Sequence, residues 1–278
     1  MKFLKFIILT MGSLYIIQAA AVTQIEGQAG GGIVPWGVLS EGEPTVSLTW
    51  VETGDYTLSS VAIQASLAKW FKQVPVELSY ARQTFDTGSV GLGKIDVDVF
   101  GGKLKLHGMN DGYWWPALAV GLQYKRTNVN DEFLNSVGAD DSDVDFYLAA
   151  TKNLHLPIVD KKLLLNATIR GTKANQIGIF GFGSSTEHGY KAQIETSVGL
   201  FVSEKTMLGV EYRMKPDNEI GKMKEDDWMN LFFSYSPSQN FSVVAAYTYF
   251  GDIAAEATPD DNYGSDQRGI YLQIQVNF

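Results

Sequence analysis

The sequence predicts an all-β protein: a transmembrane antiparallel β-barrel of about twelve strands that follows a cleaved signal peptide. Three observations predict this fold class. The chain opens like a secretory signal, segments with apolar residues at every second position recur from Thr45 onward, and the last segment ends in Phe278. A period of two gives each segment one apolar and one polar face, which predicts strands rather than helices.

The first 21 residues have the order of a signal peptide. Lys2 and Lys5 precede an apolar run over residues 6–17, and small residues follow at positions 19–21. This order predicts cleavage after Ala20 or Ala21. The apolar run is too short for a spanning helix, which needs about 20 residues. No later run is long enough either, so the mature chain is expected to be exported and soluble or inserted as a barrel.

Composition narrows the function classes. The chain has 278 residues, no cysteine, and 31 acidic against 22 basic residues, which gives a formal charge of −9. An acidic chain repels phosphate backbones, so we expect no nucleic-acid partner. Without cysteine there is no disulfide framework. Nothing resembling a linker divides the chain, and residues 45–278 are expected to form one barrel.

About twelve alternating segments follow one another, each near the 9–11 residues that cross a bilayer at a tilt. Their apolar positions fall within residues 46–50, 61–67, 76–80, 95–106, 118–124, 144–150, 163–169, 194–200, 208–214, 229–235, 241–247 and 270–278. Within the fourth segment the apolar parity changes at Gly101-Gly102, which predicts a β-bulge there.

The links between segments alternate in length. Short links lie near residues 69–73, 203–205 and 236–240, and longer ones near 86–94, 128–143, 175–189, 216–227 and 251–268. A barrel with long outer loops and short periplasmic turns has this rhythm. Both ends of the strand array are then expected on the periplasmic side.

A soluble β-sandwich would alternate as well. Charged residues in the middle of the segments favour the barrel, because a sandwich core would be apolar there whereas a wet lumen accommodates charge. Asp96, Asp98 and Asp145 are expected to face inward. The expected pore-lining residues are Glu77, Lys103, Lys105, Lys125, Arg170, Glu195, Glu211 and Arg213.

The last segment, residues 271–278, ends in an aromatic residue, as outer-membrane barrels commonly do. We therefore expect a bacterial outer-membrane location, lipids and lipopolysaccharide as neighbours, and recognition of the Phe278 strand by the barrel-assembly machinery. Aromatic residues near strand ends would form interfacial girdles. These are Trp70, Phe71, Tyr113, Trp114, Trp115, Tyr247 and Tyr249.

Residues 22–44 do not alternate. Glycine is frequent between Gly27 and Gly32, and Pro35 interrupts the stretch that follows. Residues 22–44 could take one of three arrangements with this composition: a periplasmic extension, a plug folded into the lumen, or a partial extra strand. The sequence does not decide between them.

Several runs together resemble an uncharacterised proteobacterial family of exported proteins, known only as a domain of unknown function. The resemblance covers nearly the whole mature chain and implies an envelope location without any activity. It rests on residues 26–32 with Pro35-Trp36, and on residues 52–56, 81–88, 174–176, 211–218 and 225–228.

Sites of enzymatic chemistry are weakly indicated. A twelve-stranded outer-membrane phospholipase is a known architecture, and it needs a serine beside a histidine. Ser185 lies near His188 in a predicted outer loop, but there is no G-x-S-x-G and no His-x-Ser. Loop polarity explains the pair better, and we expect no enzyme.

Metal and phosphate sites are also weakly indicated. Asp140, Asp141, Asp143 and Asp145 resemble alternate calcium ligands, yet Phe146 stands where the loop needs glycine and Lys152 where it needs glutamate. The glycine-rich run 178–183 lacks the Lys-Ser/Thr of a phosphate loop. It reads as a loop whose aromatic residues fold into the barrel mouth. We expect no metal and no cofactor.

Transport remains the leading hypothesis. Mixed charges facing inward would line a narrow channel for passive diffusion of small polar solutes and set its preference through the local field. The alternative is a closed structural or interaction barrel whose charges pair and fill the lumen. Barrels of 8 strands are filled by side chains and barrels of 16–18 strands hold water, so about twelve strands leaves both open.

Overall fold

The structure is a computed structural model. It describes residues 21–40, 44–69, 71, 74–88, 91–108, 114–220, 223, 225–253 and 263–278. Residues 1–20 of the predicted signal peptide lie outside the described residues, as do the predicted girdle residues Trp70 and Tyr113.

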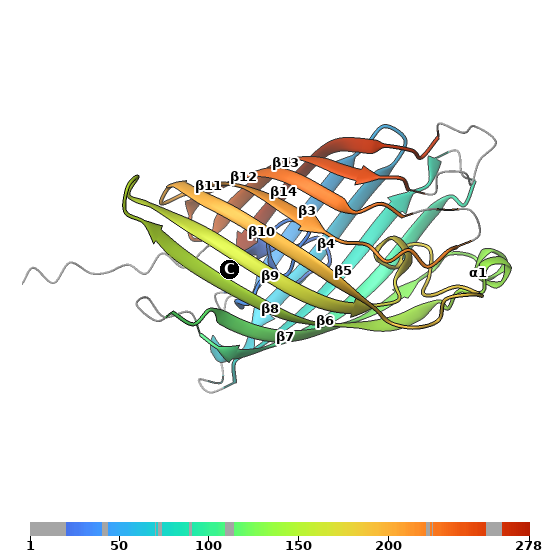
Figure 1. The fold of residues 1–278 in the computed structure, drawn as a ribbon, viewed down its shortest axis with the longest axis horizontal. Coiled ribbons are helices and arrows are strands. Elements are labelled where there is room, and N and C mark those ends of the chain that lie inside the picture. Colours follow the sequence, from blue (N-terminus) through green and yellow to red (C-terminus); the bar gives the residue numbers. More distant parts are fainter. Residues whose placement is uncertain are drawn as a thin grey trace, which may run out of the picture.

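Twelve antiparallel strands close into a barrel (Figure 1), which confirms the predicted fold class. Each strand pairs with its neighbour in sequence, and β14 pairs with β3 to close the ring. The strands are β3 (Thr45–Glu52), β4 (Thr57–Ser66), β5 (Val76–Asp86), β6 (Lys94–His107), β7 (Ala117–Thr127), β8 (Ser142–Leu156), β9 (Lys161–Thr172), β10 (Lys191–Ser203), β11 (Thr206–Arg213), β12 (Trp228–Ser238), β13 (Phe241–Gly251) and β14 (Gln267–Asn277).

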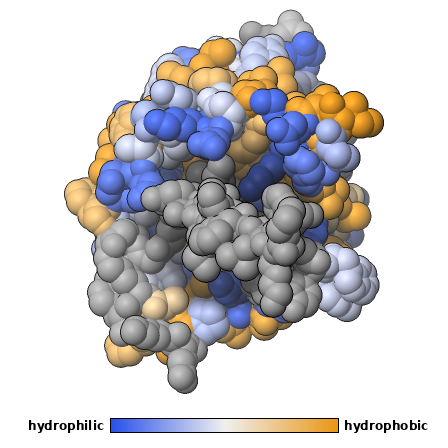
Figure 2. Space-filling view, turned by 90° about the vertical axis from the view of Figure 1, so that its left-hand side faces the viewer, coloured by the Kyte–Doolittle hydropathy of each residue, from blue (hydrophilic) through white to orange (hydrophobic). Residues whose placement is uncertain are grey.

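Side chains alternate between the two faces of the barrel wall. On β14, Leu272 is 44% exposed on the outside, whereas its neighbours Tyr271 and Gln273 are buried inside. In the end-on view of Figure 2, hydrophobic side chains lie around the rim and hydrophilic ones gather nearer the middle. The apolar outer face suits acyl chains, which is the arrangement expected of a transmembrane barrel.

Two predictions for β6 are wrong. The strand pairs with β5 in unbroken register from Lys94 to Leu104, so there is no bulge at Gly101-Gly102. The irregularity lies farther along, between Lys105 and His107. Without a bulge the parity is constant along the strand, and residues two apart share a face.

Asp96 and Asp98 therefore face outward and not into the lumen. Both carboxylates pair with Arg82 on β5, at 2.7 and 3.3 Å from its guanidinium nitrogens. The neighbouring inward positions belong to Val97 and Val99, which are buried in the apolar part of the barrel interior. The inward parity is apolar on this part of β6 because these valines belong to the buried apolar cluster, whereas a water-filled lumen would favour charge there.

The two ends of the barrel differ. The connections after β5, β7, β9, β11 and β13 are long, and one carries helix α1 (Asp131–Val137), which the Asn130 side chain caps by accepting from Phe133 N–H at 2.7 Å. The opposite end, at the left of Figure 1, has the short turns after β8, β10 and β12. It also has the longer connections after β6 and after β4, the second of which contains the 3₁₀ turn η1 (Leu67–Lys69). We call these the long-loop end and the short-turn end. No helix in the described residues is long and apolar enough to cross a membrane.

A segment that precedes the barrel lies inside it. Its two short strands, β1 (Val22–Thr23) and β2 (Ala29–Gly30), pair only with each other and add nothing to the ring of twelve. In Figure 1 this segment appears in blue behind the front wall. We call residues 22–39 the luminal segment.

Candidate functional site

The luminal segment is completely enclosed. Every residue from Val22 to Leu39 is buried. Both ends of the segment lie near the short-turn end, where Thr23 N–H donates to Gln275 at 2.7 Å and Ser40 N–H donates to Glu77 at 2.7 Å. The segment therefore enters the barrel, turns inside it and returns to the same end before β3 begins.

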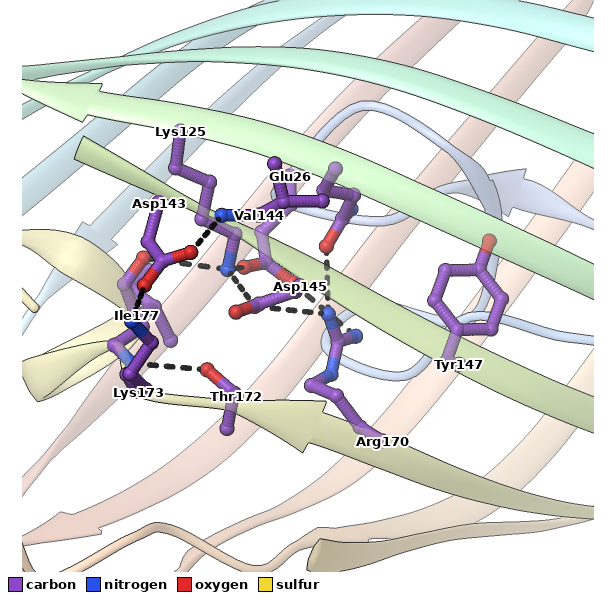
Figure 3. A network of polar contacts seen from close by, with 12 residues as sticks. Glu26, Lys125, Asp143, Val144, Asp145, Tyr147, Arg170, Thr172, Lys173 and Ile177 are labelled. Atoms are coloured by element: carbon purple, nitrogen blue, oxygen red, sulfur yellow. Dashed lines mark hydrogen bonds and ion pairs between the residues drawn. The ribbon is translucent and has the colours of Figure 1, made fainter. Parts of the chain in front are cut away.

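Glu26 lies at the centre of the contacts between the segment and the wall (Figure 3). Its carboxylate is 2.7 Å from Arg213 Nη1 and 3.6 Å from Arg170 Nη2, and it contacts Lys125 Nζ directly. All four side chains are at most 4% exposed. A buried charge is strongly unfavourable unless it is paired, so the three cations and the carboxylate hold one another in place.

Two wall carboxylates complete the network. Glu195 lies 2.6 Å from Arg170 Nε and 3.3 Å from Arg213 Nε. Asp145 lies 2.6 Å from Lys125 Nζ and 3.3 Å from Arg170 Nη1. The group thus holds three positive and three negative charges, and Glu26 supplies the last negative charge that makes it neutral.

Glu211 provides a second attachment of a different kind. Its Oε2 accepts from Gly32 N–H at 2.8 Å and Ile33 N–H at 3.0 Å, and from the Asn230 amide at 3.0 Å. A Cβ built on Gly31 would lie 1.8 Å from Glu211 Oε1. The glycine run at this point is what lets the backbone approach the carboxylate closely enough to donate to it.

A third attachment uses Glu77 and Lys103, which are 3.6 Å apart and fully buried. Glu77 accepts from Ala29 N–H at 2.9 Å, and Lys103 donates to the Ala29 carbonyl at 2.5 Å. Together they satisfy both backbone groups of one residue of the segment. Backbone groups that have no ladder partner are thereby paired by the wall.

Apolar contacts fill the remaining space. Trp36 is fully buried and its Nε1–H donates to Ser197 at 2.9 Å. The neighbouring Gly37 passes so close to the wall that a Cβ would lie 2.6 Å from the Ala117 carbonyl oxygen and 2.8 Å from that of Ala149. The segment is therefore fitted to the wall by shape as well as by charge.

The loop after β9 covers the lumen at the long-loop end. Lys125 donates to the Ile177 carbonyl at 3.4 Å and Thr127 donates to the Ile179 carbonyl at 3.0 Å, while Phe180 and Phe182 are buried. This loop contains the 3₁₀ turn η3 (Asn175–Gly178). We call residues 174–182 the mouth loop. A cavity of about 10 Å³ beneath it has room for one water.

An ion pair in the next loop holds the mouth loop. Glu225 lies 3.4 Å from Lys215 and accepts from Gln176 N–H at 3.0 Å. Burial raises the pKa of Glu225 to about 7 and lowers the pKa of Lys215 to about 8. Lys215 is the cation that pairs with Glu225, whereas three cations contact Glu26.

The eight expected pore-lining residues divide into three groups. Lys125, Arg170, Glu195 and Arg213 meet around Glu26, while Glu211 and the Glu77–Lys103 pair bind the segment elsewhere. Lys105 is half-buried two residues beyond Lys103 and takes no part in these contacts. Sequence reasoning did not select Glu26, although it is the single charged residue between positions 22 and 39.

The residues considered for catalysis and metal binding do not assemble. Ser185 and His188 are exposed in the loop after β9, and no hydrogen bond joins them in the described part of the chain. Asp141 pairs with Arg126 and Asp143 pairs with Lys173, while Asp145 belongs to the network inside. Within the described ranges, no group of three acidic or histidine side chains could hold a metal ion.

Comparison with known proteins identifies the family. Residues 19–275 match the family described as protein of unknown function DUF3034. The chain belongs to this family. No curated protein matches the sequence.

Solved structures with a similar fold are outer-membrane barrels. The COG4313 outer membrane channel from Pseudomonas putida F1 matches with a TM-score of 0.54 at 12% identity, over 87% of this chain and 97% of that one. The NanC porin has a TM-score of 0.52 at 6% identity, over 84% and 100%. The KdgM porin has 0.51 at 9% identity, over 84% and 99%. This DUF3034 chain is thus a bacterial outer-membrane β-barrel, as the sequence predicted.

Proposed function

We propose that the protein is a narrow outer-membrane channel for passive diffusion of small polar solutes, closed in this conformation by the luminal segment and the mouth loop. One observation carries the proposal: β1 and β2 pair only with each other, so the segment can leave while every hydrogen bond of the twelve-stranded ladder stays intact. A plug woven into the ladder could not do so.

The wall beneath the segment also supports passage rather than a permanent dry core. Inward positions carry amides, hydroxyls and charges where a structural core would be apolar. Examples are Ser60, Gln64, Gln83, Gln123, Thr151, Thr168, Gln193, Asn230 and Gln273. Once the segment is out, these groups would be solvated by water in the lumen. Similar barrels that bear the names porin and channel have an architecture compatible with such passage.

The test is single-channel conductance of the full chain in planar bilayers. Gly37→Ala forces a methyl group against wall carbonyls, and Glu225→Ala removes the acceptor that holds Gln176. We expect the double variant to show discrete conductance steps and the wild type to be silent. Gly189→Ala is the matched control, because a Cβ there meets nothing within 4 Å, and it should stay silent.

An added thiol makes the outcome decisive. The chain has no cysteine, so Ala29→Cys places a unique thiol on the buried segment. In the double variant it should react with a water-soluble maleimide. Labelling without conductance would mean that the emptied lumen does not conduct, and the closed structural barrel would replace the channel. Steady conductance of the wild type would contradict closure by the segment.

We further propose that β14 is the strand that the barrel-assembly machinery recognises. Its outward side chains from Ile270 to Val276 are apolar, and Phe278 beyond it is 67% exposed. Phe278→Ala should lower the fraction of folded protein recovered from outer membranes, while refolding from urea into detergent stays unchanged. Equal losses in both assays would assign Phe278 to barrel stability instead.

A further inference from the structure

The three cations around Glu26 come from three different strands. Lys125 lies on β7, Arg170 on β9 and Arg213 on β11, and all three are buried. Their nitrogens converge on one carboxylate that belongs to the segment and not to the wall. Figure 3 shows two of the three cations, Lys125 and Arg170, beside Glu26. We call these three side chains the cation socket.

The socket cannot remain empty when the segment leaves. With Glu26 in place, the charges of Lys125, Arg170 and Arg213 are balanced by Asp145, Glu195 and Glu26. Without Glu26 the wall keeps three positive charges and two negative ones, a net charge of +1. Uncompensated charge on the wall of a narrow lumen attracts a counterion. One negative charge restores neutrality.

The geometry also selects the kind of anion. Glu26 uses both of its carboxylate oxygens in the socket: Oε1 contacts the Lys125 ammonium, and Oε2 is shared by the guanidinium groups of Arg213 and Arg170. Cationic donors placed on both oxygens suit the two-oxygen head of a carboxylate. The flanking carboxylates Asp145 and Glu195 disfavour an anion with more than one charge. A monovalent carboxylate therefore fits the socket better than a phosphate.

We propose that the cation socket is a carboxylate-binding site in the lumen, that Glu26 occupies it in the closed state, and that small carboxylate-bearing solutes take its place when the segment leaves. This assignment of the solute class rests on the channel function proposed above. It makes Glu26 an internal competitor of the transported solute.

The first test is chemical rescue in detergent, which needs no conductance. Glu26→Ala leaves a carboxylate-sized space beside the socket, so acetate should raise the unfolding temperature of this variant in a concentration-dependent way. Acetamide, neutral and of the same shape, should need about ten-fold higher concentrations or fail. Phosphate should rescue less well than acetate. Equal effects of acetate and acetamide, or stronger rescue by phosphate, would overturn the assignment.

Glu211→Ala is the matched control. It also removes a buried carboxylate that binds the segment, but its partners are N–H and O–H groups and not cations. Acetate should rescue it no better than acetamide. Comparable acetate rescue of both variants would show that any buried space accepts acetate and would contradict a specific socket.

A second measurement keeps the socket intact and covers the case in which Glu26→Ala does not assemble. In the Ala29→Cys protein, acetate should compete with Glu26 and speed maleimide labelling, whereas acetamide should leave the rate unchanged. An acetate-independent rate would contradict competition for the socket. Silence of the Gly37→Ala, Glu225→Ala double variant in the bilayer experiment would instead refute the channel while leaving these two binding measurements valid.

Discussion

Arg170→Ala is expected to destabilise the barrel by about 3–5 kcal/mol, because it leaves buried carboxylates without their counter-charge. Arg170 contacts Glu195, Asp145 and Glu26, and it also donates to Gln123 at 2.6 Å. Its side chain is 1% exposed, so water cannot take over these contacts. The unfolding midpoint in urea, measured on detergent-solubilised protein, reports the loss.

Arg82→Ala is the control for this prediction. Arg82 also pairs with two carboxylates, Asp96 and Asp98, but it lies on the outer face with its side chain 49% exposed. Exposed ion pairs contribute about 1 kcal/mol or less, so this variant should unfold close to the wild type. If the two arginine variants lost equal stability, the network around Glu26 would have to be hydrated rather than dry.

Trp36→Ala is expected to release the luminal segment while the ring of strands stays folded. Truncating a fully buried tryptophan costs about 3–5 kcal/mol. Here the packing that is lost is the packing between the luminal segment and the barrel wall. The barrel ladder does not include residues 22–39, so heat-modifiable migration on gels should persist. The Ala29→Cys thiol should become accessible to maleimide much faster than in the otherwise unchanged protein.

Two substitutions separate the packing of the Trp36 ring from its hydrogen bond and from the general effect of removing a tryptophan. Trp36→Phe keeps an aromatic ring and loses the hydrogen bond to Ser197, which should cost about 1 kcal/mol and accelerate labelling only slightly. Trp114→Ala removes a tryptophan that is 77% exposed near the short-turn end, and it should not change labelling. Loss of the folded barrel in Trp36→Ala would mean that the segment is part of the folding core and does not act as a separable plug.

The barrel itself was predictable because its signal is repeated. Period-two alternation recurs in every strand. The alternation of long and short links predicted a barrel whose neighbouring strands are joined by long loops at one end and short turns at the other. The prediction went wrong on β6, where apolar residues face inward. Val97 and Val99 pack inside because the lumen holds protein and not only water, so polar parity was an unsafe guide to the inner face there.

The luminal contacts were less accessible to sequence reasoning. The wall charges Lys125, Arg170 and Arg213 stood out as mid-strand charges, but their partner lies 99 to 187 positions away in the chain. No periodicity links Glu26 to them. One local signal existed: a single acidic residue beside a glycine run, in a segment that is otherwise uncharged. A lone charge of this kind needs a partner when its surroundings are buried.

The contacts of the luminal segment cross the seam where the first and last strands of the ring meet. Thr23 accepts from Gln64 on β4 at 2.8 Å and donates to Gln275 on β14 at 3.0 Å, and these two partners lie on opposite sides of the β14–β3 junction. Joining strands more than 200 residues apart carries a large entropy loss. The luminal segment binds strands on both sides of the β14–β3 junction, and this binding offsets part of that entropy loss. The same residues that fill the lumen would then also help β14 pair with β3 during folding.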